Sequence, residues 1–278
     1  MIKININQNK NQIAMKKLIS ILCLILIISS CKKEEVFTPS LTREFSILSV
    51  TNGANYPIKV ALPQNYNPSE KYSTIYVLDG EDNFSYVANN CKEISANYGT
   101  KNIIVVAIGY GNDRSFDYTP TKADHDGGGA EKFVLFIQNE LIPKMENEFS
   151  ADTTRASRII LGHSFGGLLA AYVFTNHNGA FGNYLMLSPS IWYDNEIILK
   201  LEKEYRDLNK NAKQLVFLGL GSLESNGRML APFEAFYQIL RNNYPSLNLA
   251  KKIQQQLDHL GSKNPNIQEA LQFYFQNR

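Results

Sequence analysis

This 278-residue sequence has a small net charge and lacks long basic runs; its formal charge at pH 7 is +2. The first thirty residues hold four lysines and no acid, so the remainder is close to neutral and slightly acidic. No row of lysines or arginines is long enough to neutralise a run of phosphates. We therefore exclude nucleic acid as a partner. With 44% hydrophobic and 19% charged residues, the chain has the composition of a globular protein.

A hydrophobic run long enough to span a bilayer is also missing. The run Leu18–Ile28 is interrupted only by Ser20 and is much shorter than the roughly 20 residues that a permanent transmembrane helix needs. Lys16 and Lys17 precede it, and the small residues Ser29 and Ser30 follow. This pattern is typical of a secretory signal. We predict that residues 1–30 are a signal segment, with Met15 as its natural start.

Cysteine is rare, and its three positions are informative. Ile28-Ser29-Ser30-Cys31 resembles the lipobox of bacterial lipoproteins, in which the cysteine becomes the lipidated first residue. The resemblance implies an exported lipoprotein anchored to a membrane, in the periplasm or at the cell surface, with residues 31–43 as a polar tether. A plain secretory signal and an uncleaved anchor remain open. If the chain is a lipoprotein, Cys23 is removed with the signal. Cys91 is then the single thiol of a domain spanning residues 44–278, which excludes an internal disulfide.

Short β-rich runs alternate with amphipathic stretches over the rest of the chain. This alternation predicts an α/β fold with a mostly parallel central sheet flanked by helices. The expected strands are Phe45–Val50, Tyr56–Leu62, Ser73–Leu78, Asn102–Ile108, Arg158–Leu161, Tyr184–Leu187, Gln214–Leu218 and Leu247–Leu257. The expected helices are a stretch of about a dozen residues ending near Gly99, then Glu131–Phe149, Phe165–Asn176, Met229–Asn243 and Asn266–Gln276.

One long segment, Gly109–Gly129, carries no regular pattern, and loops of that length are usually functional or mobile. It contains Asp124-His125-Asp126. Three consecutive residues rarely converge on one ion, and no second cluster has ligand spacing, so no metal site is expected. Gly219-x-Gly221 lacks the third glycine of a dinucleotide fingerprint. No cofactor is expected.

The sharpest motif is Gly162-His163-Ser164-Phe165-Gly166, which fits G-x-S-x-G. It directly follows an expected strand and directly precedes an expected helix, which is the context that a nucleophile elbow requires. The elbow predicts an α/β-hydrolase fold with Ser164 as nucleophile. The N–H groups at the start of the helix favour negative charge, so the main-chain N–H of Phe165 is a candidate oxyanion donor.

The chain has four histidines, and elimination selects one of them as the base. The order in this fold is serine, then acid, then histidine. His125 and His163 precede Ser164, and His177 lies at the far end of a helix about 18 Å long. His259 remains, just after the last expected strand. It is the predicted general base, because a nucleophilic serine needs one.

The acid should follow a strand between the serine and the histidine. Glu224 comes soon after Gln214–Leu218 and is the preferred candidate, with Asp194 as the alternative. Asp258 adjoins His259, and neighbouring side chains in an extended stretch point apart. Trp192 and Tyr193 either wall an aromatic substrate pocket or pack in the core.

Several of these segments together resemble the esterase family that includes esterase D and, more closely, bacterial siderophore trilactone esterases. The matching segments are Tyr76–Gly80, Asp117–Pro120, Glu140–Pro143, Gly162–Gly167, Ser188–Trp192, Gly221–Glu224 and Asp258-His259. The resemblance implies a triad of Ser164, Glu224 and His259, a small ester substrate, and a second oxyanion N–H just after Gly80, at about Glu81. The family often has a glycine directly after the histidine, where this sequence has Leu260 before Gly261.

Three functions remain open at this point. The first is a serine esterase that works through an acyl-enzyme. The second is a lipid-tethered binding protein on a catalytically decayed hydrolase scaffold, since a fold does not fix a function. The third is a peptidase or acyltransferase on the same fold. An intact serine, acid and histidine in the expected order favour the enzyme. The sequence does not reveal the oligomeric state.

Overall fold

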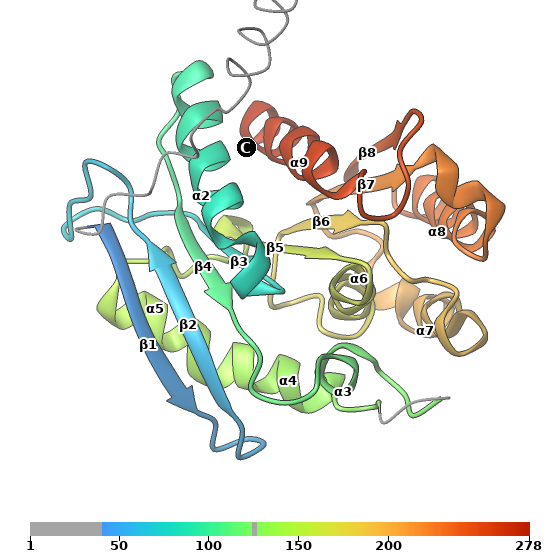
Figure 1. Ribbon diagram of the computed structural model, residues 1–278, viewed down its shortest axis with the longest axis horizontal. Helices are drawn as coiled ribbons and strands as arrows, with labels where there is room; N and C mark the ends of the chain where they lie inside the picture. Colours follow the sequence, from blue (N-terminus) through green and yellow to red (C-terminus); the bar gives the residue numbers. More distant parts are fainter. Residues whose placement is uncertain (1–40, 124–126) are drawn as a thin grey trace, which may run out of the picture. The chain divides into compact units, whose positions relative to one another are not determined.

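The computed structural model describes residues 41–123 and 127–278, all within the compact unit Phe37–Arg278. Its centre is a sheet with the strand order β1-β2-β4-β3-β5-β6-β7-β8 (Figure 1). The strands are β1 Thr42–Leu48, β2 Asn55–Ala61, β3 Thr74–Val77, β4 Ile104–Ile108, β5 Arg158–His163, β6 Asn183–Leu187, β7 Gln214–Gly221 and β8 Leu247–Gln254.

The sheet is mostly parallel. β1 pairs with β2 and β2 with β4 in antiparallel register, whereas every pairing from β4 to β8 is parallel. β4, with the sequence IVVAI, is buried along its whole length. Such β-branched runs suit strands that are covered on both faces. The predicted mostly parallel sheet is confirmed, and the predicted strands are observed with small shifts at their ends.

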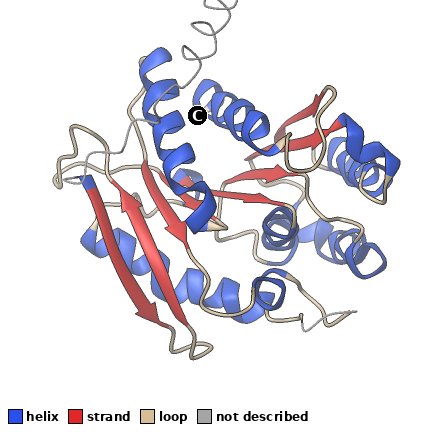
Figure 2. Ribbon diagram, in the orientation of Figure 1, coloured by secondary structure: helices blue, strands red, loops and turns tan. Residues whose placement is uncertain are grey.

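Helices cover both faces of the sheet (Figure 2). One face packs against α2 and α9, whose apolar residues share a core with Ile75, Ile159 and Leu185. The other face packs against helices that include α6, whose side chains are nearly all buried. The helices are α2 Gly80–Asn97, α3 Arg114–Tyr118, α4 Ala130–Phe136, α5 Ile142–Glu148, α6 Phe165–Asn176, α7 Tyr193–Asn209, α8 Leu230–Asn243 and α9 Lys263–Asn277.

Some helices differ from the sequence-based expectation. The helix expected over Glu131–Phe149 is α4 and α5 joined by a π-helical turn, Ile137–Leu141. α2 has 18 residues rather than about a dozen. α7 and the short α3 were not expected at all. The first turn of α7 includes three residues of left-handed conformation, Asp194, Asn195 and Glu196, and no side chain caps its start.

The parallel strands all end at one edge of the sheet, where the candidate site lies. In the parallel part of the sheet, β3, β5, β7 and β8 all run in the same direction. The segments that follow them therefore meet beyond their carboxyl ends. Among the described residues, no helix is long and apolar enough to cross a membrane. The predicted signal segment and most of the tether lie outside the described residues.

Candidate active site

Ser164 lies on a tight turn between β5 and α6. Its backbone has φ 61° and ψ −118°, a conformation that costs about 1–3 kcal/mol for a residue with a side chain. Gly162 permits the turn, because a Cβ there would lie 2.3 Å from the carbonyl carbon of Gly166. The Ser164 N–H donates to the Leu187 carbonyl of β6 at 2.9 Å. This hydrogen bond to the neighbouring strand therefore stabilises the strained turn. Ser164 itself remains partly exposed.

The first turn of α6 faces the serine. The N–H of Leu168 donates to the Ser164 carbonyl at 2.9 Å, which is the first i→i−4 bond of the helix. The N–H groups of Phe165 and the two glycines after it have no acceptor inside the helix, as at every helix start. They carry the positive end of the helix dipole. The predicted oxyanion donor, Phe165, is the first of these residues.

His259 and Glu224 are 35 residues apart in sequence, but their side chains are in contact in the fold. The His259 Nδ1 lies 2.7 Å from Oε2 of Glu224. The Glu224 side chain is 2% exposed, whereas that of His259 is 37% exposed. Glu224 sits in a short 3₁₀ turn directly after β7, and His259 lies between β8 and α9. One ring nitrogen of His259 is thus held by the carboxylate.

The second oxygen of the Glu224 carboxylate is held as well. Oε1 accepts hydrogen bonds from the Gly221 N–H and the Ser188 hydroxyl, each at 2.7 Å, and a longer one from the Ser262 hydroxyl at 3.3 Å. Burial acts to raise the pKa of Glu224, but the bonds from His259, Gly221 and Ser188 outweigh it and hold the pKa below its ordinary value. The carboxylate therefore stays ionised at neutral pH.

A second imidazole lies against His259. The rings of His163 and His259 have centroids 4.6 Å apart, and His163 Nε2 lies 2.9 Å from the His259 carbonyl oxygen. Because that oxygen only accepts, Nε2 carries the proton. Burial, and then the proximity of His259, lower the pKa of His163 to about 4. His163 is thus a neutral donor that fixes the main chain of His259.

The turn after β3 carries the residue that resemblance implies as the second oxyanion donor. Asp79 has the left-handed backbone angles φ 52° and ψ 50°, and Glu81 is the second residue of α2. Gly80 lies so close to β4 that a Cβ there would be 2.7 Å from the Ile108 nitrogen. Only glycine fits that approach. The N–H of Glu81 is in the first turn of α2, where the helix offers it no acceptor.

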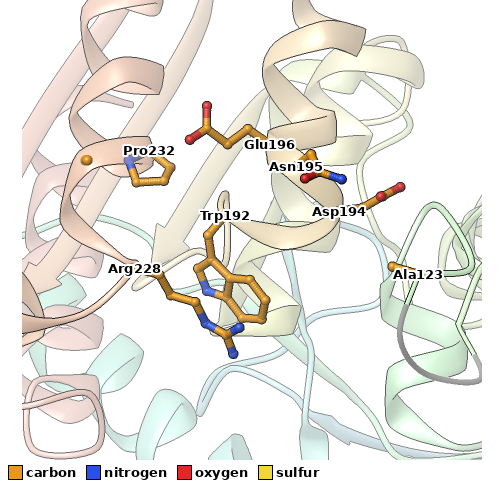
Figure 3. Close-up of a pocket in the computed structure, with 8 residues that line it drawn as sticks. Ala123, Trp192, Asp194, Asn195, Glu196, Arg228 and Pro232 are labelled. Carbon is orange, nitrogen blue, oxygen red and sulfur yellow. The ribbon is translucent and has the colours of Figure 1, made fainter.

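Trp192 lines a cavity of about 900 Å³, together with Ala123, Asp194, Asn195, Glu196, Arg228, Ala231 and Pro232. Figure 3 shows the guanidinium of Arg228 beside the Trp192 ring, and its carbon is 3.2 Å from the ring centroid. The ring of Phe165, next to the serine, is 6.1 Å from that of Trp192. Tyr193 is buried behind this wall, and its hydroxyl donates to the Thr121 carbonyl at 2.7 Å.

The alternatives weighed from sequence lie elsewhere or serve other contacts. Asp194 accepts a 2.6 Å bond from the Thr121 hydroxyl, and Asp258 accepts one from the Gly261 N–H at 2.8 Å. His177, at the end of α6, pairs with Glu131 at 2.7 Å. Cys31 and Asp124-His125-Asp126 lie outside the described residues. Within the described part, no three metal-binding side chains form a cluster.

A family model described as "Putative esterase" matches residues 49–260. The chain belongs to this family. It is therefore a carboxylic ester hydrolase, and the sequence-based resemblance is confirmed. Among similar proteins of known role is the ferri-bacillibactin esterase BesA of Bacillus subtilis (strain 168), which is 29% identical over 213 residues, or 68% of this chain and 73% of that protein. A siderophore triacetylfusarinine C esterase of Aspergillus fumigatus is 31% identical over 57% of this chain and 59% of that protein.

Two solved structures share the fold. The BES protein of Bacillus cereus superposes with a TM-score of 0.76 at 28% identity, over 88% of this chain and 98% of that one. An IroE-like serine hydrolase of Shewanella oneidensis gives a TM-score of 0.75 at 24% identity, over 84% and 80% of the two chains. The expected α/β-hydrolase fold is confirmed.

Sequence reasoning missed several residues around the esterase site. Arg114 and Tyr110, from the long segment after β4, both bond the Asp79 carboxylate. Arg228 lies over Trp192, and Ser188 holds Glu224. Asp79 and Ser188 lie within segments typical of the family, and Tyr110 and Arg114 lie within the long segment Gly109–Gly129, so the sequence marked their neighbourhoods but not their roles. The roles of the two arginines could not be predicted, because they depend on contacts between distant parts of the chain.

Proposed function

We propose that this esterase hydrolyses small carboxylic esters through an acyl-enzyme on Ser164, with His259 as general base and Glu224 as the acid of the triad. The observation that carries the proposal is the 2.7 Å bond between His259 Nδ1 and Glu224, in a loop that His163 anchors beside the nucleophile elbow. A carboxylate on Nδ1 fixes the tautomer in which Nε2 is free to accept a proton.

The reaction would proceed in two halves. The Ser164 oxygen attacks the ester carbonyl carbon as His259 Nε2 takes its proton, and the N–H groups of Phe165 and Glu81 stabilise the oxyanion. Collapse of this intermediate breaks the ester bond, and His259 returns the proton to the leaving alcohol. Water then attacks the acyl-enzyme as His259 takes its proton, the bond to the Ser164 oxygen breaks to release the acid, and His259 returns the proton to that oxygen.

We propose siderophore-type esters as the substrate class. Support comes from the relatives, which are named for esters of bacillibactin and triacetylfusarinine C. The cavity of about 900 Å³ beside Trp192 falls in the size range of small-molecule sites. Trp192 would form its wall, and Tyr193 would hold that wall from behind.

We also propose that the chain is a lipoprotein anchored through Cys31. The support is the basic start, the apolar run and Ser29-Ser30-Cys31 at its end. The anchor would place the esterase domain at a membrane surface, in the periplasm or outside the cell.

A fluorophosphonate probe tests the nucleophile, and two ester substrates test the class. The wild-type protein should be labelled on one peptide that contains Ser164, and the Ser164→Ala variant should not be labelled. Ferri-bacillibactin or triacetylfusarinine C should gain one water per ester bond cleaved, as followed by mass spectrometry. Labelling of Ser164→Ala at the wild-type rate would contradict the nucleophile. If the protein cleaves simple aryl esters but neither siderophore, the substrate class is contradicted and the nucleophile is not.

A further inference from the structure

One guanidinium contacts both turns of the proposed oxyanion hole. Arg114, the first residue of α3, makes a two-pronged ion pair with the carboxylate of Asp79, from Nε to Oδ1 and from Nη2 to Oδ2 at 2.8 Å. The same Nη2 donates to the main-chain carbonyl of His163 at 3.2 Å. Asp79 is two residues before Glu81, and His163 is two residues before Phe165. Arg114 thus bridges the segments that carry the two proposed oxyanion N–H groups.

Within residues 41–123 and 127–278, Arg114 is the basic side chain that pairs with the Asp79 carboxylate, and neutral groups fix the same turn. The Tyr110 hydroxyl donates to Oδ1 at 2.8 Å, and the Asp79 N–H donates to the Tyr118 hydroxyl at 2.9 Å. The carboxylate is 7% exposed, while the Arg114 side chain is 31% exposed. A carboxylate buried to that degree holds a left-handed backbone only while its hydrogen bonds are satisfied.

Two aromatic rings lie close to the Arg114 guanidinium. Its guanidinium carbon lies 5.2 Å from the centroid of the Tyr118 ring and 5.8 Å from that of Phe165. The pairing with Asp79 raises the pKa of Arg114 further, against the effect of burial. The planar, permanently charged guanidinium of arginine can donate to the two Asp79 oxygens and the His163 carbonyl oxygen in a fixed arrangement. A lysine ammonium does not reproduce this geometry.

We propose that Arg114 is a positioning residue that sets the spacing between the oxyanion N–H groups of Phe165 and Glu81. The proposal rests on the function proposed above. It implies that a loss of the bridge weakens binding of the tetrahedral oxyanion but not of the ground-state ester. Loss of one oxyanion donor costs about 10²–10³ in kcat in a measured protease, and a displacement of about 1 Å can cost about 10². We therefore expect a 10- to 100-fold effect.

The test compares Arg114→Lys with wild type in the full-length protein. The variant keeps the positive charge beside Asp79 but cannot reach both partners. We expect kcat to fall 10- to 100-fold with KM within about threefold. The inhibition constant of a trifluoromethyl ketone, which forms an anionic adduct with the serine, should rise by the same factor as kcat/KM falls. The inhibition constant of an uncharged amide analogue of the ester should not change.

Arg158→Lys is the matched control. Arg158 also bonds one carboxylate, Glu146, and two main-chain carbonyls, those of Thr153 and Ala180. It lies at the opposite end of β5 from Ser164. This variant should lower the melting temperature without changing either inhibition constant. If Arg114→Lys does not fold, the double variant Asp79→Asn/Arg114→Gln removes both charges together, and its shorter side chain should still fail to bridge the turns.

Two results would overturn the proposal. One is an unchanged trifluoromethyl ketone constant in a folded Arg114 variant. The other is unchanged amide hydrogen exchange at residues 80–84 and 164–167, since loosening of both turns is expected whether or not ester is turned over. A wild-type protein without Ser164-dependent turnover would refute the proposed function instead, and the exchange measurement would still decide the role of Arg114.

Discussion

Replacing Glu224 by glutamine tests the proposed acid with almost no change in shape. In the native protein Oε1 accepts from the Gly221 N–H and the Ser188 hydroxyl, and Oε2 faces His259 Nδ1. The amide oxygen of glutamine must take the Oε1 position, because an NH₂ group there would oppose the Gly221 N–H. The NH₂ then faces Nδ1, so that Nδ1 becomes an acceptor and the ring proton moves to Nε2.

That tautomer cannot take the proton of Ser164. The analogous change in a measured serine protease lowers kcat by about 10⁴ with the geometry preserved. We expect Glu224→Gln to lower kcat by about 10³–10⁴, or roughly 4–5 kcal/mol of transition-state stabilisation, with KM within a few-fold. Stopped-flow and steady-state hydrolysis of an aryl ester measure both constants, and thermal melts should show little change at pH 7.

Glu131→Gln is the matched control, because it alters another Glu–His pair of the described chain. Glu131 and His177 lie 2.7 Å apart at the far end of α6. This change should leave kcat within about twofold. Asp194→Asn should also cost little and act mainly on KM, since an amide oxygen can still accept the Thr121 hydroxyl. The assignment of the acid is refuted if Glu224→Gln keeps more than a tenth of wild-type kcat, or if Asp194→Asn is the more damaging change.

The remaining predictions concern other residues. Ser164→Ala should remove ester hydrolysis from a folded protein, by up to about 10⁶ in kcat as in a well-studied protease; more than a tenth of wild-type kcat would sink the assignment. The pKa of His163 is lowered from 6.5 to about 4, so the unfolded chain binds more protons in that interval. The free energy of unfolding should therefore fall as the pH drops from about 6.5 toward 4. His163→Gln should flatten this slope in a series of thermal melts, and an unaltered slope would contradict it. A ligand in the cavity should change the emission of Trp192, the single tryptophan of the chain, and an emission unchanged at saturating product acid would argue against this cavity as the binding site. Cys31→Ser should release the protein from membranes, and mass spectrometry of an unmodified N-terminus at any other residue would refute the anchor.

The sequence predicts the strands well and the helices unevenly. Strands such as β4 and β5 are continuous apolar runs, because both faces of the sheet are covered. Their burial is therefore visible in the residues themselves. α7 was missed for a local reason. Its first turn holds the acidic residues Asp194 and Glu196, but the backbone from Asp194 to Glu196 is left-handed and no side chain caps the start of the helix.

Some residues of the site can be predicted from the sequence around them, whereas others depend on contacts with distant residues. Ser164 is predictable, because the glycines and the strand–helix context around it are local. His259 follows by elimination among four histidines, and Glu224 by its place after a strand. Arg114 is not predictable, since its partners Asp79 and His163 lie 35 and 49 residues away. Contacts between distant residues leave no periodic pattern in a single sequence.

The position of His259 shows why the site needs more than its three proposed catalytic side chains. β5 and β8 are separated by β6 and β7, so their ends are roughly 14 Å apart at ordinary strand spacing. The loop after β8 must therefore fold back across the sheet edge to bring the imidazole to Ser164. Two contacts hold it there: the Glu224 carboxylate on Nδ1 and the His163 imidazole on the main-chain carbonyl. Because His163 adjoins Ser164 in the chain, the second contact ties the proposed base directly to the elbow that carries the proposed nucleophile. A loop held at both its side chain and its backbone would keep Nε2 in position through each proposed proton transfer, without relying on the distant register of β8.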